Sequence, residues 1–458
     1  MIEIADPLQS FSEFPGPVLL LAGPGTGKTH QLAMRIKYLI EALHAKPGEI
    51  AVITFTNEAA RNMRERIAED DINIAPDDTP AIISTMHSLG NAIIGSRPEL
   101  FGLTEDYSAL TEDQSRMVLL KDAATLCGIH RSKAKITDEC RRKGSCVEDS
   151  SLDKCRVCKE YRALLRKCSL VDYDDQILLA CKALRDDADL KNLWHTKTRY
   201  LLVDEYQDIN KAQCEFIQLL TEGQPEGLFA VGDDDQSIYS FRGGTPEYIR
   251  EFQHYYGEKV KIGRLSKNRR SSEHILKGAR SIVTTYYKQS VWKPEPTFDE
   301  KRKDNNKIIF YDVPSDKMEA YIIADMIEKK IKSNKVTVII PNGNYFPPVR
   351  EALKKKRIAY NYKTKIDEHG ITRFVVLVDW TENPENNLLL RYLTDLIIEN
   401  NDQLMKTVYL KINGLREKRN TAAELMASLW QEVDTNNSLY KVICNKATQK
   451  KNILSLLS

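Results

Sequence analysis

The 458-residue sequence lacks the segments that carry a protein into or across a membrane. No apolar run approaches the ~18 residues that a membrane-spanning helix needs. The first 14 residues, MIEIADPLQSFSEF, have neither the basic start nor the apolar stretch of a secretory signal. We therefore expect a cytoplasmic protein without a membrane partner.

Internal repeats, low-complexity tracts and a large charge of one sign are also missing. The 67 Lys and Arg residues nearly balance the 65 Asp and Glu residues, which leaves a formal net charge of +2. Hydrophobic residues make up 42% and charged residues 29%, as in a soluble globular protein of roughly two to four domains. No group of acidic residues with the spacing of a nuclease site stands out, so the sequence does not lead us to predict nucleic-acid cleavage.

One local excess of positive charge stands out against this balance. Residues 261–303 hold 12 Lys and Arg residues but only 4 Asp and Glu residues. A basic stripe of this kind can follow a phosphate backbone, and a solvated face is the alternative. For KKKR (354–357), which lies on an expected helix, the solvated face is the preferred interpretation.

A glycine-rich stretch, AGPGTGKT (22–29), predicts a phosphate-binding loop. PVLLLA (17–22) is expected to form a buried strand, and residues 29–43 have the spacing of an amphipathic helix. The glycines let backbone N–H groups converge on phosphate oxygens. Lys28 would reach the β- and γ-phosphates, and the Thr29 hydroxyl would complete a Mg²⁺ shell. The predicted ATP-binding residues are Ala22, Gly23, Pro24, Gly25, Thr26, Gly27, Lys28 and Thr29.

A second apolar strand, 201–203, ends in two adjacent acids. Asp204 is predicted to hold Mg²⁺ together with Thr29. Glu205 is placed to deprotonate an attacking water, as a general base does. An acidic turn that caps a helix is the alternative, but it explains neither the strand nor the pairing with a phosphate loop.

The run VGDDDQSIYSFRG (231–243) completes the pattern. Tyr239 and Phe241 alternate with polar residues and precede Arg242, an arrangement on which single-stranded bases stack at about 1–3 kcal/mol each. A phosphate loop, an acidic strand end and this run, in this order, indicate a motor that couples ATP hydrolysis to movement along nucleic acid.

On these motifs the chain resembles the UvrD/Rep/PcrA group of superfamily 1A DNA helicases. TFTNEAARNMRERI (54–67) is similar to motif Ia, STMHSLG (84–90) to motif Ib and LSKNRRSS (265–272) to motif IV. LVDYDDQILLA (170–180) resembles the segment before the acidic strand, and the similarity covers residues 9–360. It implies ATP-driven 3′ to 5′ movement on single-stranded or partly duplex DNA, in repair, replication restart or antiviral defence.

The resemblance also implies roles for single residues. Beside Glu205, the catalytic set includes Gln236, which senses the γ-phosphate, and Arg270, which stabilises transition-state charge. A core position for Phe55 and a structural role for His87 are equally good interpretations. The implied DNA-contacting residues are Phe55, Thr56, Asn57, His87, Tyr239, Phe241 and Arg242.

Several departures from the family pattern fall near the expected adenine site. Arg269 replaces the tyrosine that stacks on adenine, His30 replaces an arginine, and Glu58 replaces a lysine. Gln9 is the candidate for a glutamine that reads adenine, at a short spacing from the loop. The nucleotide-binding residues therefore include Gln9 and Arg269 beside the phosphate loop.

Two late family motifs, V and VI, are not found in the sequence. The second of them carries another γ-phosphate arginine, and such a residue contributes on the order of 10³-fold to hydrolysis. Two hypotheses follow. The chain is either a working translocase, or an ATP-gated DNA-binding subunit or fragment that needs a protein partner or a further C-terminal part.

The expected fold is α/β, with two RecA-like parallel-sheet domains of the P-loop NTPase class and inserted helical subdomains, and ATP in the cleft between the two sheets. In the second sheet, strands 308–313, 336–340 and 358–362 alternate with helices 315–332 and 347–357. The expected parts are residues 1–88 plus 190–262 (first RecA-like domain), 89–189 (helical insert), 263–370 (second RecA-like domain, incomplete) and 371–458 (helical).

Four of the nine cysteines gather in the helical insert: Cys140, Cys146, Cys155 and Cys158. In a cytosolic protein such a cluster favours a metal over disulfides. The pair with two intervening residues is the part most similar to a zinc or iron–sulfur ligand pair. We therefore predict a structural Zn²⁺ or a [4Fe–4S] cluster, with scattered reduced cysteines as the alternative.

Overall fold

The computed structural model describes residues 13–69, 71–110, 113–144, 151–286, 297–298, 308–331, 336–341 and 343–361. The chain divides into two compact units, Met1–Asn306 and Lys307–Ser458. Gln9, Cys146 and the predicted helical region 371–458 lie outside the described residues. None of the described helices combines the length and apolar character that crossing a bilayer requires.

The first unit is built on a six-stranded sheet in which every neighbouring pair is parallel. Three strands are buried at every position, which is expected where helices cover both faces of a sheet. The strands predicted at 17–22 and 201–203 are confirmed. In spatial order the strands are β3 (Ile82–Thr85), β2 (Ile50–Thr54), β6 (Tyr200–Val203), β7 (Leu228–Gly232), β1 (Val18–Ala22) and β8 (Lys261–Leu265).

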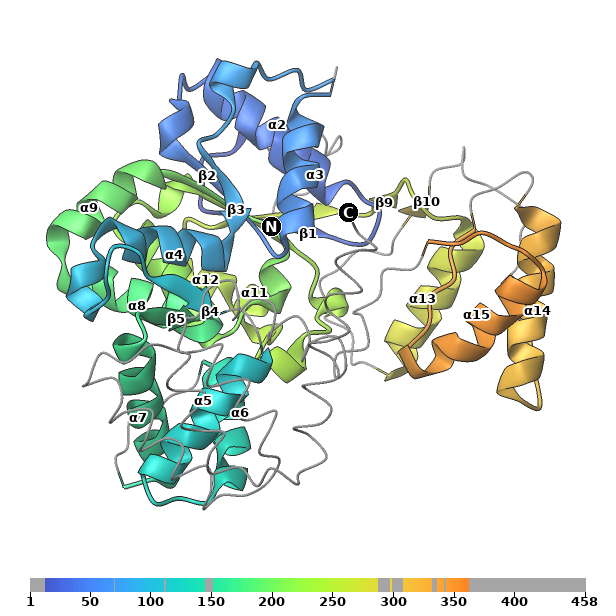
Figure 1. Cartoon of the computed structure of the whole chain (residues 1–458). Coiled ribbons are helices and arrows are strands. Elements are labelled where there is room, and N and C mark those ends of the chain that lie inside the picture. The colour runs from blue at the N-terminus through green and yellow to red at the C-terminus, as the bar shows by residue number, and fades with distance from the viewer. Residues whose placement is uncertain are drawn as a thin grey trace, which may run out of the picture. The chain divides into compact units, whose positions relative to one another are not determined.

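Alternate residues of β1 feed two separate hydrophobic cores, one on each face of the sheet. Val18 and Leu20 pack with residues of α2 (Lys28–Glu41) and α3 (Asn57–Ile67). Leu19 and Leu21 belong to the other core, because successive side chains of a strand point to opposite faces. Helices on that face are α4 (Met86–Ser96), α8 (Tyr173–Asp186), α9 (Ala188–Lys197), α10 (Lys211–Thr221), α11 (Glu247–Arg250) and α12 (Phe252–Tyr256). Figure 1 shows the helices of the two faces on opposite sides of the strands.

The carboxyl ends of β6, β7 and β1 meet at one edge of the sheet. These strands are neighbours in that order, and each runs directly into one of the three motifs that the sequence singled out. Ligands of open parallel sheets bind outside the carboxyl ends of the strands. The topology therefore brings three distant segments to one candidate site.

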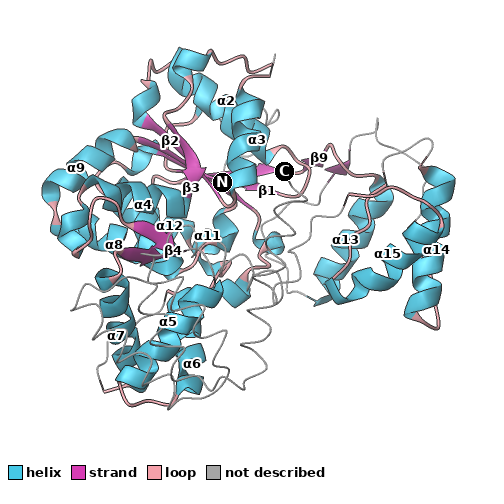
Figure 2. Cartoon of the chain, in the orientation of Figure 1, coloured by secondary structure: helices cyan, strands magenta, loops and turns pink. Residues whose placement is uncertain are grey.

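A helical lobe is inserted between β4 (Ser108–Leu110) and β5 (Leu170–Asp172), which pair in parallel. Figure 2 shows these helices below the sheet. They pack on one another and are α5 (Asp113–Leu126), α6 (Ala134–Arg142) and α7 (Asp153–Lys167). After the sheet, β9 (Lys267–Asn268) pairs with β10 (Thr297–Phe298), and α13 (Glu273–Tyr286) lies between them in sequence.

The described part of the second unit is a pair of packed helices. α14 (Asp316–Lys330) and α15 (Phe346–Lys355) meet through a small core that includes Ala324 and Leu353. Both helices were expected, at 315–332 and 347–357, and both are confirmed.

The three strands expected beside these helices are absent from the described residues of this unit. Residues 308–313, 336–340 and 358–361 form no strand. Phe310 and Ile339 are 90% and 91% exposed, whereas strands of a parallel sheet are buried on both faces. The prediction of a second parallel sheet is therefore wrong for the part of this unit that the structure describes, because these apolar segments have no ladder partners there.

Candidate nucleotide and nucleic-acid site

The phosphate loop turns on two glycines in left-handed conformations. Gly25 has a φ of 71°, and Gly27, with a φ of 106°, precedes the first turn of α2. The Thr26 backbone N–H and hydroxyl both donate to the Gly23 carbonyl, at 3.3 and 2.8 Å. Gly27 offers no side chain to cap α2, and the first turn of that helix holds no acid. The N–H groups at this helix start thus face the loop, an arrangement that binds phosphate.

Lys28 and Glu205 meet across the edge of the sheet. The Lys28 Nζ lies 2.7 Å from Glu205 Oε2, and the two side chains are 12% and 33% exposed. Glu205 has a φ of 52° and a ψ of 44°, a left-handed conformation that costs a glutamate about 1–2 kcal/mol. Such strain at a chemically active side chain is a usual feature of active sites.

Two acids near Glu205, Asp204 and Asp208, have raised pKa values. Burial and the Glu205 charge raise the pKa of Asp204 to about 6. The same two causes raise the pKa of Asp208 to about 6. The Asp208 Oδ1 is buried without a hydrogen-bond partner in the described structure. Carboxylate oxygens are the ligands that a hard divalent cation such as Mg²⁺ prefers, but these three acids do not bring their ligand atoms within 4.8 Å of one another in the described structure.

The loop after β7 reaches the same edge through Gln207. The Gln236 amide donates to Asp233 Oδ2 at 2.6 Å, and the Asp233 N–H donates to Gln207 Oε1 at 2.9 Å. The Gln207 Nε2 in turn donates to Glu205 Oε2 at 2.8 Å. Gln236 is thereby linked to the predicted base by hydrogen bonds. Gln207 was not among the predicted site residues, although it lies within the same acidic motif.

Residues 268–271 pack directly against the phosphate loop. The Arg269 N–H donates to the Gly25 carbonyl at 2.8 Å, and the Asn268 Nδ2 donates to the Pro24 carbonyl at 2.5 Å. Asn268 is 1% exposed, and its Oδ1 accepts from the N–H groups of Arg270 and Ser271. Both predicted arginines are thus brought to the loop, with the Arg270 side chain exposed. Asn268, which orders this segment, was missed.

His30, one of the departures from the family pattern, pairs with the side chain of Arg66. Its Nδ1 lies 2.5 Å from Arg66 Nη2, and Arg66 also pairs with Asp71 at 2.6 Å. Burial and the Arg66 charge lower the pKa of His30. A neutral imidazole held in this way cannot replace the charge of an arginine.

Three aromatic side chains from two loops form a cluster beside the acids. Phe55 follows β2, and its ring centroid lies 4.7 Å from that of Tyr239. Tyr239 and Phe241 lie 5.8 Å apart, and Phe241 is 66% exposed. We call Phe55, Tyr239 and Phe241 the aromatic cluster. The exposed ring of Phe241, beside the half-buried rings of Phe55 and Tyr239, suits stacking by unpaired bases.

The other residues predicted to contact DNA are placed differently. Thr56 caps α3, because its hydroxyl accepts from the Ala59 N–H. Asn57 is the exposed first residue of that helix. The side chain of Arg242 lies outside the described structure.

A cavity of about 280 Å³ lies between Phe55, one member of the aromatic cluster, and the acids Asp204, Glu205 and Asp208. Its lining includes Phe55, His87, Glu205 and Tyr173. The His87 and Tyr173 rings are stacked, with centroids 3.6 Å apart and planes at 24°. Tyr173 was not predicted, although its aromatic ring within LVDYDDQ was a visible signal. We call this space the edge cavity.

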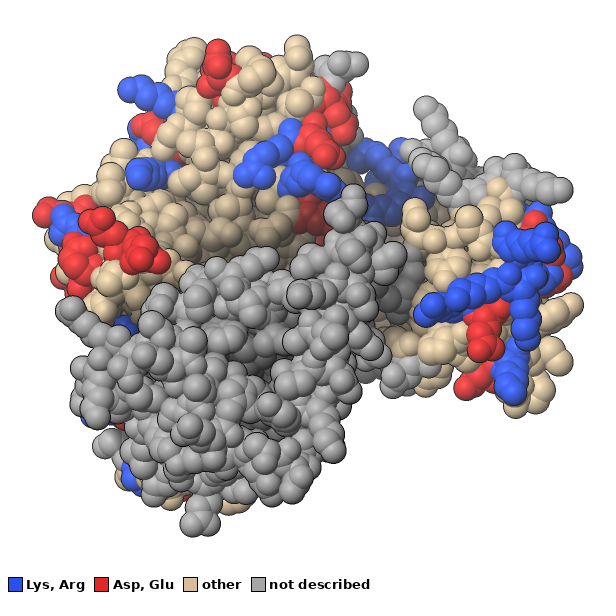
Figure 3. Space-filling view, viewed as in Figure 1, with Lys and Arg blue, Asp and Glu red and all other residues tan. Residues whose placement is uncertain are grey.

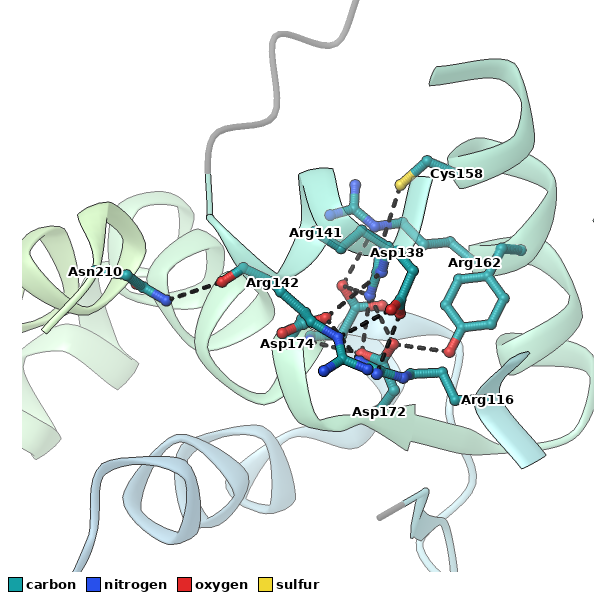
Figure 4. A network of polar contacts seen from close by, with 11 residues as sticks. Arg116, Asp138, Arg141, Arg142, Cys158, Arg162, Asp172, Asp174 and Asn210 are labelled. Carbon is teal, nitrogen blue, oxygen red and sulfur yellow. Dashed lines mark hydrogen bonds and ion pairs between the residues drawn. The ribbon is translucent and has the colours of Figure 1, made fainter. Parts of the chain in front are cut away.

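Arg116 and Arg142 also line the edge cavity and belong to a buried polar network, shown in Figure 4. At its centre, Arg141 Nη2 donates to both carboxylate oxygens of Asp172, at 2.8 and 2.9 Å. The Asn210 amide, at the start of α10, donates to the Arg142 carbonyl at 3.4 Å. The network therefore ties the helical lobe to the sheet domain next to the site.

The described cysteines of the predicted metal cluster are not gathered around one point. Cys155 and Cys158 are buried on α7 and Cys140 is half-buried on α6. Cys158 Sγ accepts from Arg141 Nη1 at 3.3 Å, and burial raises the pKa of its thiol. Over the described ranges, Asp233–Asp235 alone bring three acidic, Cys or His ligand atoms within 4.8 Å of one another. Because Cys146 lies outside them, the four-cysteine site stays a prediction.

Figure 3 shows Lys and Arg intermixed with Asp and Glu over the visible described surface. This pattern agrees with a net charge of +2.

Comparison with known proteins assigns the family. Residues 5–257, more than half of the chain, match the UvrD/REP helicase N-terminal domain. The ATP-dependent DNA helicase Rep of Buchnera aphidicola subsp. Schizaphis graminum is 31% identical, over 95% of this chain and 66% of the relative. Rep of Buchnera aphidicola subsp. Acyrthosiphon pisum is 32% identical, over 95% and 68%. The ATP-dependent DNA helicase PcrA of Bacillus subtilis is 30% identical, over 81% and 52%.

The chain thus spans between about half and about two thirds of the length of these relatives. The expected resemblance is confirmed, and so is the α/β class, by a parallel sheet of six strands. This chain belongs to the UvrD/Rep helicase family.

Proposed function

We propose that this protein hydrolyses ATP and uses the energy to move 3′ to 5′ along single-stranded DNA, separating the duplexes that it meets. The observation that carries the proposal is one shared edge of the sheet. There the Lys28–Glu205 pair, the aromatic cluster and the edge cavity lie together. The names of the relatives, all ATP-dependent DNA helicases, support the same activity.

The Lys28–Glu205 ion pair supports an order of events in hydrolysis. A γ-phosphate that enters the loop competes for the Lys28 ammonium, so that Glu205 loses its cationic partner. The released carboxylate then accepts a proton from the attacking water. Thr29 and Asp204 would hold Mg²⁺, which neutralises charge on the phosphate oxygens. Arg270 extends this stabilisation from the segment that packs on the loop.

DNA is proposed to run over the aromatic cluster and the mouth of the edge cavity. Bases stack on Tyr239 and Phe241, because exposed rings accept any base without reading its sequence. His87 and Tyr173 offer a second stacked pair. The cavity reaches Glu205 from this side, so a bound strand lies next to the residues that hydrolyse ATP.

The first experiment is a measurement of ATP hydrolysis with and without oligo(dT). We expect DNA to stimulate turnover. In Glu205→Gln, turnover should fall by about 10²-fold or more, with nucleotide affinity unchanged. Glu215→Gln, on the exposed side of α10, serves as the matched control. Normal turnover in Glu205→Gln would remove its assignment as base. Binding of ATP and DNA by the unmodified chain without turnover would instead support the ATP-gated binding subunit that awaits a partner.

The proposed metal in the helical lobe has its own test. A Zn²⁺ or [4Fe–4S] cluster at Cys140, Cys146, Cys155 and Cys158 requires the Cys158 thiol to leave the Arg141 guanidinium and ionise. Metal analysis of the purified protein should give one zinc, or iron with absorbance near ~400 nm. Protein that is free of both metals, with all thiols reactive, would show that the cysteines are scattered and reduced.

A further inference from the structure

Gln207 lies between the predicted base, Glu205, and the loop that follows β7. It follows Glu205 by two residues, in the short 3-10 helix Tyr206–Asp208, and is 1% exposed. Its Nε2 donates to Glu205 Oε2 at 2.8 Å and to Asp208 Oδ2 at 3.3 Å. Its Oε1 accepts from the Asp233 N–H at 2.9 Å. The amide is thus satisfied on both sides.

The partners of Gln207 fix which way its amide points. A flipped amide would set its oxygen against two carboxylates and its NH₂ against a backbone N–H donor. Every contact would then be repulsive in a buried site, where unmatched polar groups are costly. Gln207 is therefore a stiff bridge between the Glu205 carboxylate and the backbone at Asp233.

The bridge continues into the loop that holds two members of the aromatic cluster. The Ser237 hydroxyl donates to the Gln207 carbonyl at 3.2 Å, and the Gln236 amide donates to Asp233 at 2.6 Å. Both the side chain and the backbone of Gln207 thus hold residues 233–237, two positions before Tyr239. A displacement of this loop would act on the Gln207 amide through one hydrogen bond, from the Asp233 N–H to Gln207 Oε1.

The backbone around this junction leaves no room for adjustment. A Cβ at Gly232 would lie 2.6 Å from Gln207 Oε1 and 3.2 Å from the Gln207 nitrogen. Because a contact under about 3 Å forces one side to move, only glycine at 232 lets the amide keep its place. The close packing restricts Gln207 to the conformation that reaches Glu205.

The Gln207 bridge matters most for the orientation of Glu205 once a nucleotide is bound. Glu205 Oε2 is contacted by both Lys28 and Gln207. Once a γ-phosphate takes the Lys28 ammonium, the Gln207 amide remains as the contact that orients the carboxylate. We propose that Gln207 is a positioning residue that transmits the position of the DNA-contacting loop 233–241 to the general base, so that bound DNA sets the orientation of Glu205. This inference rests on the proposed function.

The test uses the full chain and separates coupling from binding. In Gln207→Ala, we expect the DNA-stimulated turnover to fall by about 5- to 150-fold, the usual range for coupling between sites. The Kd for oligo(dT) and the Kd for a fluorescent ATP analogue should stay within about threefold, less than 1 kcal/mol. Gln224→Ala removes a comparable amide-to-carbonyl hydrogen bond, to His195, and should change none of these quantities.

A second variant disturbs the same bridge without replacing Gln207, because a Cβ added at Gly232 meets the Gln207 amide oxygen and also lies 2.8 Å from Ile249 Cδ1. Gly232→Ala should push the Gln207 side chain from its place and reproduce the loss of stimulation with DNA and nucleotide affinity retained. It also serves if Gln207→Ala does not fold. Full DNA stimulation in both variants, or a parallel loss of DNA affinity, would overturn the coupling role. An unmodified chain that binds DNA but gains no turnover from it would refute the proposed function itself.

Discussion

At the scale of single residues, the phosphate loop is set by glycines that no other residue replaces without cost. A Cβ on Gly25 would lie 2.6 Å from the Arg270 Cβ and 3.0 Å from the Asn268 amide nitrogen. Gly128 has a similar positive φ, 67°, with nothing within 4 Å of its added Cβ. The two positions share a left-handed backbone that only glycine adopts without strain, but they differ in how crowded an added Cβ would be.

This pair of glycines gives the first prediction. Gly128→Ala should lower the free energy of unfolding by about 1–2 kcal/mol, the cost of a left-handed non-glycine residue. Gly25→Ala should lower it further and weaken ATP binding by about tenfold or more, because residues 268–270 can no longer pack on the loop. Urea unfolding and titration of a fluorescent ATP analogue measure both effects. Equal results for the two variants would show that crowding at Gly25 is unimportant.

The aromatic cluster supports a second prediction at this scale. Phe241→Ala should weaken oligo(dT) binding by about 1–3 kcal/mol, the value of one stacked base, without changing its salt dependence. Ile238, in the same loop, is 70% exposed but offers no ring, so Ile238→Ala should leave the affinity unchanged. Fluorescence anisotropy at several salt concentrations distinguishes them. A similar loss in both variants would mean that the loop contributes apolar area rather than stacking.

The residues that could be predicted are those whose type and local spacing carry their chemistry. Lys28 begins α2 directly after the phosphate loop, whereas Asp204 and Glu205 follow the end of β6, and the structure brings these motif residues to one edge. Asn268 could not be found in this way. Its hydrogen bond to Pro24 joins positions 244 residues apart, and no local pattern states which distant carbonyl a buried amide will meet.

At the scale of elements, the junction between the helical lobe and the sheet domain contains carboxylates that compete for the same positive charge. Asp172 is completely buried, and the charge of Arg141 together with its hydrogen bonds lowers its pKa. Burial and the Asp172 charge raise the pKa of Asp174 to about 7. Arg116 pairs with Asp174 at 3.4 Å, but burial and the neighbouring Asp172 charge outweigh this positive charge.

The raised pKa of Asp174 predicts a pH dependence with a definite sign. Between pH 3.8 and about 7 the folded protein holds a proton here that the unfolded chain releases. Stability from this group is therefore complete at low pH and is lost as the pH rises towards 7. Asp174→Asn should remove that loss, changing the difference in unfolding free energy between pH 5 and pH 8 by about 1–3 kcal/mol. Asp189→Asn, exposed on α9, is the control, and an unchanged slope in Asp174→Asn would refute the assignment.

The same scale shows why helices were easier to predict than strands. α14 and α15 have apolar residues at helical spacing, and the hydrogen bonds of a helix are local, so the pattern sufficed. The apolar runs at 308–313 and 336–340 are typical of strands, but a strand also needs partners supplied by distant segments. In the first unit β1 pairs with β7 and β8. Val18 pairs with Phe229, 211 residues further along the chain, and with Lys261, 243 residues further along.

At the scale of the whole molecule, the first unit holds everything that the described site requires. All six strands of the sheet, both large hydrophobic cores and every described residue assigned to ATP or DNA lie within Met1–Asn306. Each ladder partner of β1 is inside this unit, and so are the Lys28–Glu205 pair and the Gln207 bridge. The described contacts that build the site are therefore made between residues of this unit.

This arrangement predicts that residues 1–306, produced alone, fold and bind both ligands. We expect one cooperative urea transition, and affinities for the ATP analogue and oligo(dT) within about threefold of the full chain. Turnover should fall if residues 307–458 complete the hydrolytic site, and should persist if they do not. Circular dichroism, anisotropy and a phosphate-release assay on the two chains side by side decide between these outcomes. A 1–306 chain that unfolds, or binds neither ligand, would show that the two units form a single cooperative structure.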